Sequence, residues 1–477
     1  MKRSTLDALI PIPCRITRTG KRLKIAGLRN FHAAEAFRSL IPEVAALFRT
    51  FDLPIRETAE NRANFILARA ALPAEAFRIT VAETGVTVEA GSAAGAFYAL
   101  SACRQMFFAT LIVGTNAAEL DCGVIADEPR FGCRGVLLDS ARRFQDVGTI
   151  RNVLRLMAEF RLNRFHWHLT DDQGWRLALQ TTRGLENEGT LTPGFYTPAD
   201  IREVTELARE LHIEVIPEVD IPGHSAVLLE KYPQYACPNA DGAVREICLG
   251  NPAAQRFLKD ILTEVTELFP ESRSIHIGGD EAELHNWEKC PRCQAARQAL
   301  HCANMRELEN RFMNEMSRFI VQCGRTPVVW GNGSGPAYPS DTVIQSWLDL
   351  REPLRAAEHG NPVIYSMHNS LYFDYPANLS EPWESWMFEL TERGVYMCDP
   401  HVVWAEQVKD AILGTEACLW TETVPRWRVT AKLLPRLWAY SECAWSRPEN
   451  KNWHDFAARK EALEAAGYGV ALLRERA

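Results

Sequence analysis

The chain has 477 residues, of which 47% are hydrophobic and 24% are charged. This is the composition of an ordinary globular protein, and the length suits one large barrel with a companion domain. A formal net charge of −8 and a pI near 5.9 argue against nucleic acid and anionic membranes as partners. We therefore expect no nucleic-acid partner and no membrane partner.

The first 125 residues are expected to form a small α+β domain, because strand-like segments mix with two segments of helical spacing. Glu83-Thr84-Gly85 predicts a turn between the last two strands. The proline and glycine in residues 122–132 indicate a connector to the next domain. The expected strands are 21–28, 64–70, 77–82 and 86–90, and the expected helices are 33–51 and 93–108.

Residues 126–477 are expected to form a second domain, in which short apolar strands alternate with helices and a helical segment closes the chain. Near-continuous apolar strands joined by helices predict a parallel sheet covered on both faces, and eight of them predict a (β/α)₈ TIM barrel. Thr197-Pro198-Ala199-Asp200 predicts a helix start with a capping box. The expected strands are 135–140, 164–170, 213–220, 274–277, 326–332, 342–347, 362–367 and 415–420, and the expected helices are 146–160, 197–211, 252–268 and 428–445.

Acidic and aromatic residues occupy the predicted carboxyl ends of these strands, which is where TIM barrels carry their active sites. Each residue alone has a structural explanation as a turn former, a helix cap or a core side chain. Together they predict hydrolysis of a sugar, which needs a proton donor, negative charge and a flat apolar surface for the ring. The residues at these ends are Asp139, Asp171, Asp220, Asp280, Glu281, Trp330, Trp347, Met367 and Trp420.

The segment SIHIGGDE, residues 274–281, places two carboxylates side by side after an alternating apolar run. In a continuous strand Asp280 and Glu281 would point to opposite faces, so both can serve one site only if the strand ends before them. Gly278 and Gly279 allow the backbone to bend there.

Six segments in order resemble the motifs of glycoside hydrolase family 20, the β-N-acetylhexosaminidases. The resemblance covers about residues 125–446, and the hairpin and helix at 77–108 resemble the small α+β domain that precedes the barrel in that family. It implies an exo-acting, retaining enzyme that removes terminal non-reducing N-acetylglucosamine or N-acetylgalactosamine from glycans or oligosaccharides. The segments are RGVLLDSARRF (134–144), NRFHWHLTDDQGWR (163–176), EVIPEVDIPGHS (214–225), IHIGGDE (275–281), SLYFDYP (370–376) and EACLWTE (416–422).

The resemblance also implies roles for single residues in substrate-assisted catalysis, in which the acetamido oxygen of the substrate attacks the anomeric carbon and forms an oxazolinium intermediate. Glu281 is then the general acid and base. Asp280 holds the acetamido N–H, and Tyr372 donates to the acetamido oxygen. Asp171 and His224 tune Glu281 through hydrogen bonds.

Sugar binding is expected from a second group of residues. By the same resemblance, tryptophans wall the acetamido pocket, and charged residues hold the sugar hydroxyls, which predicts action on a terminal sugar. Three further tryptophans in the connection before the last strand shape the aglycone side or pack the surface. The first two sets are Trp330, Trp347 and Trp420, and Arg134, Asp374 and Glu422; the third is Trp383, Trp386 and Trp404.

Two other functions fit parts of the pattern. His166-Trp167-His168 also occurs as the His-x-His pair of metal-dependent barrel amidohydrolases, and His224, His276 and Asp220 would complete a ligand set. The alternative explanation is that His166 and His168 are hydrogen-bonded structural residues in the barrel mouth. A catalytically silent carbohydrate-binding protein would have the same fold and pocket.

Thirteen cysteines without a framework spacing suit a reducing compartment, and the basic N-terminus lacks an apolar stretch of signal-peptide length, so we expect a cytoplasmic protein. No cofactor is expected for the reaction. Cys290-Pro291-Arg292-Cys293, with His285, His301 and Cys302 nearby, could hold structural zinc. The motif lacks a second CxxC, and a pair of reduced thiols at a helix start is the alternative.

Overall fold

The computed structural model describes residues 4–111, 118–186, 192–238, 244–331, 338–349, 351–403 and 409–469. They divide into two compact units, the first formed by the described residues within 1–132, 155–161 and 437–477 and the second by those within 133–154 and 162–436. Among the described helices, none combines the length and the apolar character that a membrane span requires.

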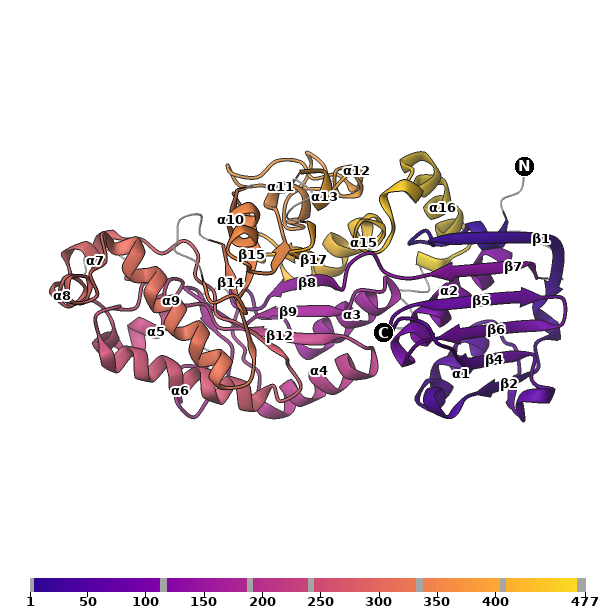
Figure 1. Ribbon diagram of the computed structural model, residues 1–477, viewed down its shortest axis with the longest axis horizontal. Helices are drawn as coiled ribbons and strands as arrows, with labels where there is room; N and C mark the ends of the chain where they lie inside the picture. The colour runs from indigo at the N-terminus through magenta and orange to yellow at the C-terminus, as the bar shows by residue number, and fades with distance from the viewer. Residues whose placement is uncertain are drawn as a thin grey trace. The chain divides into compact units, whose positions relative to one another are not determined.

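The first unit contains a seven-stranded mixed sheet in the order β1-β7-β5-β6-β4-β2-β3 (Figure 1). β5 and β6 form the predicted antiparallel hairpin, and their inward residues alternate with partly exposed ones along each strand. Helix α2 packs on both strands. The bounds are β1 Arg15–Lys24, β2 Asn30–Ala33, β3 Arg56–Glu57, β4 Phe65–Arg69, β5 Phe77–Ala82, β6 Gly85–Ala90, β7 Glu119–Asp127, α1 Ile41–Arg49, α2 Ala93–Leu111 and α16 Trp453–Ala465.

The prediction that residues 122–132 form a connector is wrong for most of that segment. β7 runs through Asp127 and pairs with both β1 and β5 inside the sheet. Leu120, Cys122 and Ile125 are buried in it, so the apolar residues of the segment, and not the proline and glycine after it, determine its structure. Pro129 and Gly132, which suggested a connector, follow the strand.

The second unit confirms the predicted TIM barrel. Eight parallel strands close in the order β12-β13-β14-β15-β16-β17-β8-β9, and each pairs in parallel register with both neighbours. All eight are almost completely buried because helices cover them outside and side chains fill the barrel inside. The strands are β8 Cys133–Asp139, β9 Arg164–His168, β12 Glu214–Glu218, β13 Ser274–His276, β14 Thr326–Trp330, β15 Val343–Ser346, β16 Val363–Tyr365 and β17 Ile412–Leu419.

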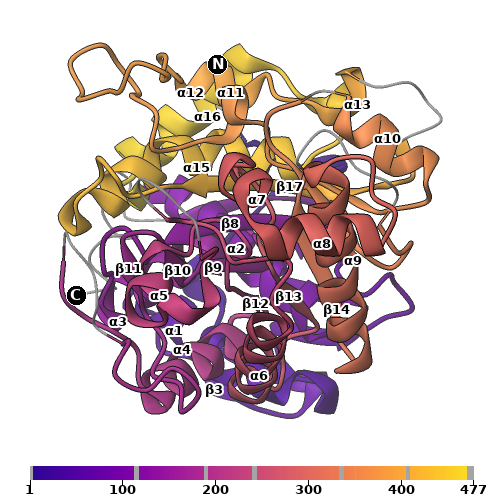
Figure 2. The same cartoon turned by 90° about the vertical axis from the view of Figure 1, so that its left-hand side faces the viewer.

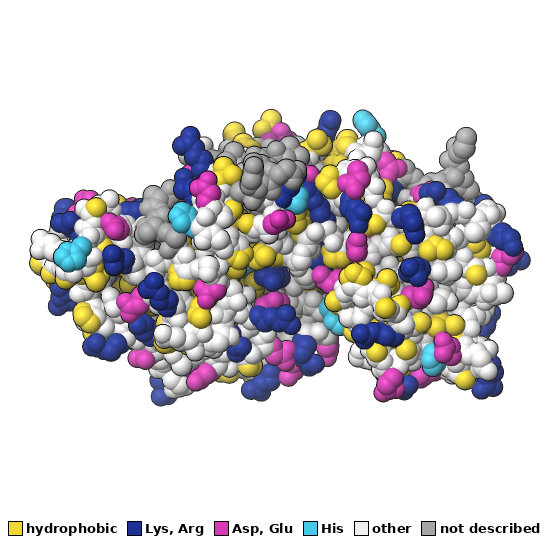
Figure 3. All heavy atoms as spheres, viewed as in Figure 1, with side chains coloured by type: hydrophobic (Ala, Val, Ile, Leu, Met, Phe, Trp, Pro, Cys, Tyr) yellow, Lys and Arg dark blue, Asp and Glu magenta, His cyan; other side chains and the backbone are white. Residues whose placement is uncertain are grey.

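The connecting helices begin where the sequence signals predict. α4 starts with the predicted capping box, in which Thr197 and Asp200 satisfy each other's backbone N–H groups. In both views α4, α6 and α9 lie outside the barrel strands (Figure 1, Figure 2), and basic and acidic side chains intermix on the described surface in view (Figure 3). The helices are α3 Val147–Glu159, α4 Pro198–Glu210, α5 Ala226–Lys231, α6 Pro252–Leu268, α7 His285–Lys289, α8 Pro291–Ala299, α9 Met305–Gln322, α10 Glu352–Glu358, α11 His368–Leu371, α12 Glu392–Tyr396, α13 Pro400–Val403 and α15 Val429–Trp445.

Candidate active site

A cavity of about 460 Å³ opens at the carboxyl ends of the barrel strands. This volume lies within the ~300–1,000 Å³ range of small-molecule sites. Eight of the predicted site residues line the cavity, together with Arg142, His168, Asp220 and Trp386, among others. The eight are His224, Asp280, Glu281, Trp347, Tyr372, Asp374, Trp420 and Glu422.

The turn after β13 brings the two adjacent carboxylates into the same cavity. The strand ends at His276, and φ is +67° at Gly278, +107° at Gly279 and +48° at Glu281. A Cβ atom on Gly278 would lie 1.6 Å from Asp220 Oδ1, so only glycine fits there. Asp220 Oδ1 in turn accepts the Gly279 N–H at 3.3 Å and fixes the turn. Left-handed backbone at Glu281, a non-glycine residue, is strain of the kind that collects at functional sites.

A chain of charged groups runs from Arg142 to Glu281. Arg142 Nη2 lies 2.8 Å from Asp171 Oδ2, and His224 Nδ1 lies 3.2 Å from Asp171 Oδ1. His224 Nε2 then faces Glu281 Oε2 at 3.6 Å and Asp280 Oδ2 at 3.9 Å. Asp171 is buried behind the cavity wall and therefore orients His224 without lining the cavity.

These contacts determine the protonation states of Asp171 and His224 in this chain of charged groups. Burial opposes ionisation of Asp171, but the charges of Arg142 and His224 hold the pKa of Asp171 well below its ordinary value. Burial also favours neutral His224, yet Asp171 and Asp220 raise the pKa of His224 well above its ordinary value. His224 is therefore a cation beside Glu281.

The two adjacent carboxyls differ in environment. Burial raises the pKa of Asp280 to about 6; His224 opposes this rise and Glu281 adds to it. The side chain of Glu281 is 57% exposed, and its hydrogen-bonding contact with His224 lowers the pKa of Glu281, against the smaller effect of burial. The position facing solvent suits exchange of a proton with a leaving group or with water.

Two buried carboxyl oxygens, Asp280 Oδ1 and Asp374 Oδ1, have no hydrogen-bond partner among the described residues. Both residues line the cavity, so a bound molecule with two N–H or O–H donors would satisfy them. Burial raises the pKa of Asp374 to about 8, and the charge of Glu422 adds to the rise. Two hydrogen bonds fix the loop around Asp374. Lys432 Nζ donates to the Asp374 carbonyl oxygen at 2.9 Å, and Arg436 donates to Tyr375 O at 3.0 Å.

Aromatic rings wall one side of the cavity. The rings of Tyr372 and Trp420 lie 6.0 Å apart between centroids, and the Arg142 guanidinium lies 4.9 Å over Trp420. Trp347 is fixed by an Nε1–H bond to Gly331 O at 3.0 Å. Trp330 does not line the cavity: it is buried, donates to Glu218 Oε1 at 2.7 Å and stands behind Trp420 at 5.9 Å.

Arg134 was predicted to hold sugar hydroxyls, and the structure corrects this placement. Arg134 is the second residue of β8, at the end of the strand away from the mouth, and its side chain is fully buried outside the described cavity lining. Arg142 takes the position at the mouth. The backbone N–H of Arg142 donates to Asp139 Oδ1 at 3.0 Å, and Asp139 Oδ2 accepts from Thr421 N at 3.0 Å, which ties the turn to the residue before Glu422.

The His-x-His pair belongs to a buried network at the base of the cavity, and His168 also lines the cavity. His166 Nδ1 lies 2.7 Å from Glu416 Oε1 and Nε2 lies 3.1 Å from Glu218 Oε2, while His168 contacts the same Glu218 and Asp171. His276 Nδ1 adds a contact to Glu218 Oε1 at 3.0 Å. Each histidine thus contacts a buried carboxylate, and His166 with Glu218 and His276, like His168 with Glu218 and Asp220, also has the spacing of a possible metal-ligand group.

Sequence reasoning missed Arg142 as a lining residue, whereas Asp220, predicted at a strand end, does line the cavity. The signal for Arg142 was its position three residues after Asp139 at a strand end, where the turn returns to the mouth. Trp386 lines the cavity and Trp383 is exposed, whereas Trp404 lies outside the described residues.

A TIM barrel whose mouth combines paired carboxyls, unsatisfied carboxyl oxygens and aromatic walls has the site of a glycoside hydrolase. Residues 131–448 match the model of the glycosyl hydrolase family 20 catalytic domain, and residues 7–128 match the model of domain 2 of that family. The chain belongs to glycosyl hydrolase family 20.

Known proteins agree with this membership. A β-hexosaminidase from Akkermansia muciniphila is 30% identical over 408 residues, which cover 81% of this chain and 82% of that protein. The structure of a family 20 exo-β-N-acetylglucosaminidase from Vibrio harveyi with N-acetylglucosamine aligns with a TM-score of 0.87 at 26% identity, covering 99% of this chain and 79% of that one. A β-N-acetylhexosaminidase from Bacteroides fragilis aligns with a TM-score of 0.83 at 29% identity, covering 96% of both chains.

Proposed function

We propose that this chain removes a terminal β-linked N-acetylhexosamine from glycans or oligosaccharides. The observation that carries the proposal is the pair of buried, unsatisfied oxygens on Asp280 and Asp374 at one cavity, with Glu281 beside them. A 2-acetamido sugar supplies the two kinds of donor that these oxygens need, an amide N–H and ring hydroxyls. Family membership supports the same reaction.

In the first step, Glu281 gives its proton to the glycosidic oxygen while the acetamido oxygen attacks the anomeric carbon. The bond to the leaving group breaks, and a positively charged oxazolinium ring forms. Asp280 accepts the acetamido N–H and stabilises this charge. His224, a cation beside Glu281, stabilises the carboxylate that Glu281 becomes when its proton leaves.

In the second step, the Glu281 carboxylate takes a proton from water, and the water oxygen attacks the anomeric carbon. The oxazolinium ring opens and the acetamido group is restored. Two attacks from opposite faces retain the β configuration. Tyr372 donates to the acetamido oxygen in both steps and prevents rotation away from the anomeric carbon.

Charged groups in the cavity lining that can hold the outer hydroxyls favour a terminal sugar. Asp374, Glu422 and Arg142 are the groups for its outer hydroxyls, and Trp347 and Trp420 contact the ring and the acetamido group. Trp386 lines the cavity and is 61% exposed, so it is placed to contact the aglycone where the cavity meets solvent.

The reaction as proposed uses no cofactor, because the substrate supplies the nucleophile and the protein supplies the acid, base and charge. Any metal near Cys290 and Cys293 would be structural, since neither residue is part of the described cavity lining. We also propose a reducing, cytoplasmic setting, which is supported by thirteen cysteines that form no disulfide with one another in this structure.

The test is release of nitrophenol from aryl N-acetyl-β-glucosaminide and aryl β-glucoside, with brief chelator exposure and metal analysis in parallel. We expect chelator-insensitive release from the first substrate and very weak release from the second. Absence of release with retained sugar binding would indicate a silent binding protein. If the chelator removes a metal that the cysteines do not hold and release stops, the protein is a metal-dependent hydrolase. Equal turnover of both substrates would exclude participation of the acetamido group.

A further inference from the structure

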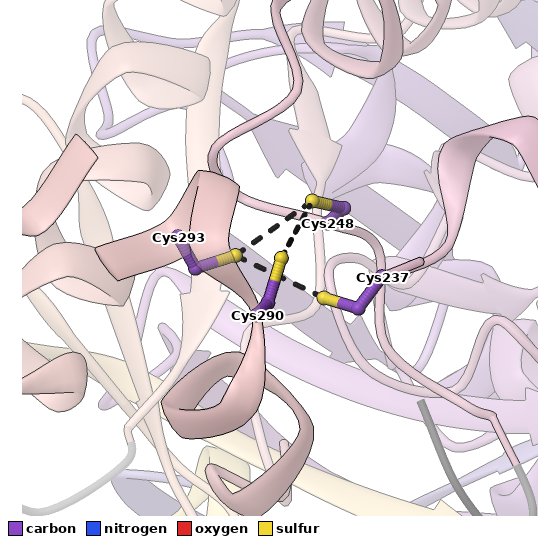
Figure 4. Close-up of side chains that lie close together, drawn as sticks. All are labelled: Cys237, Cys248, Cys290 and Cys293. Carbon is purple, nitrogen blue, oxygen red and sulfur yellow. Dashed lines mark hydrogen bonds between the residues drawn. The ribbon is translucent and has the colours of Figure 1, made fainter. Parts of the chain in front are cut away.

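Four buried cysteines from two separate segments of the barrel unit meet at one point (Figure 4). Cys237 and Cys248 lie in the connection between α5 and α6, and Cys290 and Cys293 flank the start of α8. At most 4% of each residue is exposed. The histidines and Cys302 that the sequence suggested as partners of the CxxC pair are not part of this group.

The four sulfur atoms have the spacing of a tetrahedral zinc site. Cys237 Sγ lies 3.8 Å from Cys293 Sγ, Cys248 Sγ lies 3.7 Å from both Cys290 Sγ and Cys293 Sγ, and all four lie within 4.8 Å of one another. Four thiolates around zinc at ~2.3 Å place neighbouring sulfur atoms about 3.8 Å apart. A disulfide would require a sulfur–sulfur distance of ~2.05 Å, so these cysteines form no disulfide with one another here.

The backbone around the cluster suits thiolates. Cys290 is the N-cap of α8, Pro291 is the first residue of the helix, and Cys293 lies in the first turn, where the helix dipole favours negative charge. The backbone N–H of Gly250 also donates to the Cys293 sulfur. A Cβ atom on Gly250 would lie 2.2 Å from Arg292 O, so only glycine allows this close approach.

We propose that Cys237, Cys248, Cys290 and Cys293 bind one structural zinc ion as four thiolates. Four soft sulfur ligands in a closed, buried site select zinc, and a closed set leaves no position for substrate. The four thiols release their protons to solvent when the metal binds.

The ion would fasten the loop that carries His224 to the loop that carries Glu281. Ile247 N donates to Pro222 O at 2.9 Å and Ser225 N donates to Arg245 O at 2.9 Å, so the segment before Cys248 runs beside His224. The two loops are also joined where Trp287 Nε1 donates to Ile247 O at 2.9 Å. Zinc at the cysteines would thus preserve the 3.6 Å approach of His224 to Glu281 from a distance.

The experiment measures zinc by mass spectrometry in the full chain purified without chelator from zinc-supplemented cells. We expect about one zinc per chain, as a four-cysteine structural site requires. Cys248→Ser should reduce the zinc content several-fold, and Cys302→Ser, a buried cysteine in the neighbouring segment, should leave it unchanged. X-ray absorption at the zinc edge of the unaltered protein should show sulfur neighbours at ~2.3 Å only, which tests the site even where Cys248→Ser fails to fold.

Three results would overturn the proposal. The first is a zinc content near zero with four alkylatable thiols, which would mean plain reduced cysteines. The second is a mass showing disulfides among the four under native, non-reducing preparation. The third is zinc retained equally in Cys248→Ser and Cys302→Ser, or nitrogen and oxygen neighbours in the absorption spectrum, which would place the metal elsewhere.

Discussion

Replacing Asp280 with asparagine should stabilise the protein at neutral pH while it abolishes the proposed chemistry. The carboxyl is buried, one of its oxygens is unsatisfied, and its pKa is raised from 3.8 to about 6 by burial, with Glu281 adding to the rise. The folded state therefore binds more protons than the unfolded state between pH 4 and pH 6. Stability contributed by this group is present at low pH, falls as the pH rises through that window, and stays low above it.

The difference of about two pKa units corresponds to about 3 kcal/mol at pH 7, and asparagine, which does not titrate, avoids this cost. The measurement is urea unfolding at pH 4 and pH 7 by tryptophan fluorescence for the parent and Asp280→Asn, with the exposed Asp260→Asn on α6 as the matched control. We expect Asp280→Asn to gain stability over the parent at pH 7 and much less at pH 4. Equal stability of the two proteins at pH 7, or a loss in Asp280→Asn, would refute the argument that this carboxylate is held at a cost for function.

Four further outcomes follow from the site. Glu281→Gln should lose on the order of 10² to 10⁴ in rate, least for leaving groups that need no proton, as a leaving-group series would measure; an equal loss for all leaving groups would contradict its role. Arg142→Ala should raise KM for the sugar, whereas the conservative Arg134→Lys, far from the mouth, should change the unfolding midpoint and leave KM unaltered; steady-state kinetics and thermal melts separate the two. Gly278→Ala combines φ of +67° with a Cβ 1.6 Å from Asp220 Oδ1, so its loss of folding free energy should be well over the ~1–2 kcal/mol of left-handed backbone alone. Gly324→Ala, at φ +75° with open space around it, should show only that smaller loss in parallel thermal melts. The alkaline limb of kcat should lie at higher pH than that of kcat/KM, and coincident limbs in both pH profiles would count against a general acid whose pKa rises in the complex.

The barrel was predictable from sequence because its signals are local. Each strand is a short apolar run, and features such as the capping box at Thr197 and Asp200 mark the helices between them. The sequence also predicted that Asp280 and Glu281 share a site if β13 ends early, and the strand does end at His276. What makes this possible is the fit of Gly278 against Asp220, a contact 58 residues apart that no local pattern contains.

Contacts between distant segments explain the predictions that the structure corrected. Arg134 is an exception, because its place at the amino end of β8 follows from the predicted strand direction, whereas Arg142 reaches the mouth through the turn after Asp139. The partners of Cys290 and Cys293 were missed because they come from a distant segment. Cys237 and Cys248 are 42 to 56 residues away in sequence from the CxxC pair, and only the tertiary fold brings their sulfur atoms to within 3.8 Å of it.

In the free site, the pKa values of the two adjacent carboxyls have the opposite order to the one that catalysis needs. Asp280 has a pKa of about 6, raised by burial, and the contact with His224 keeps the pKa of Glu281 low, yet the reaction requires a charged Asp280 and a protonated Glu281. A bound sugar changes both. Its acetamido N–H donates to Asp280 Oδ1 and stabilises the charged form, and its leaving group removes water from Glu281 and favours the neutral form. Both changes come from the acetamido sugar and its aglycone. A sugar without the acetamido group leaves the charged form of Asp280 without an N–H donor. The contact that selects the substrate therefore also prepares the two carboxyls for the reaction.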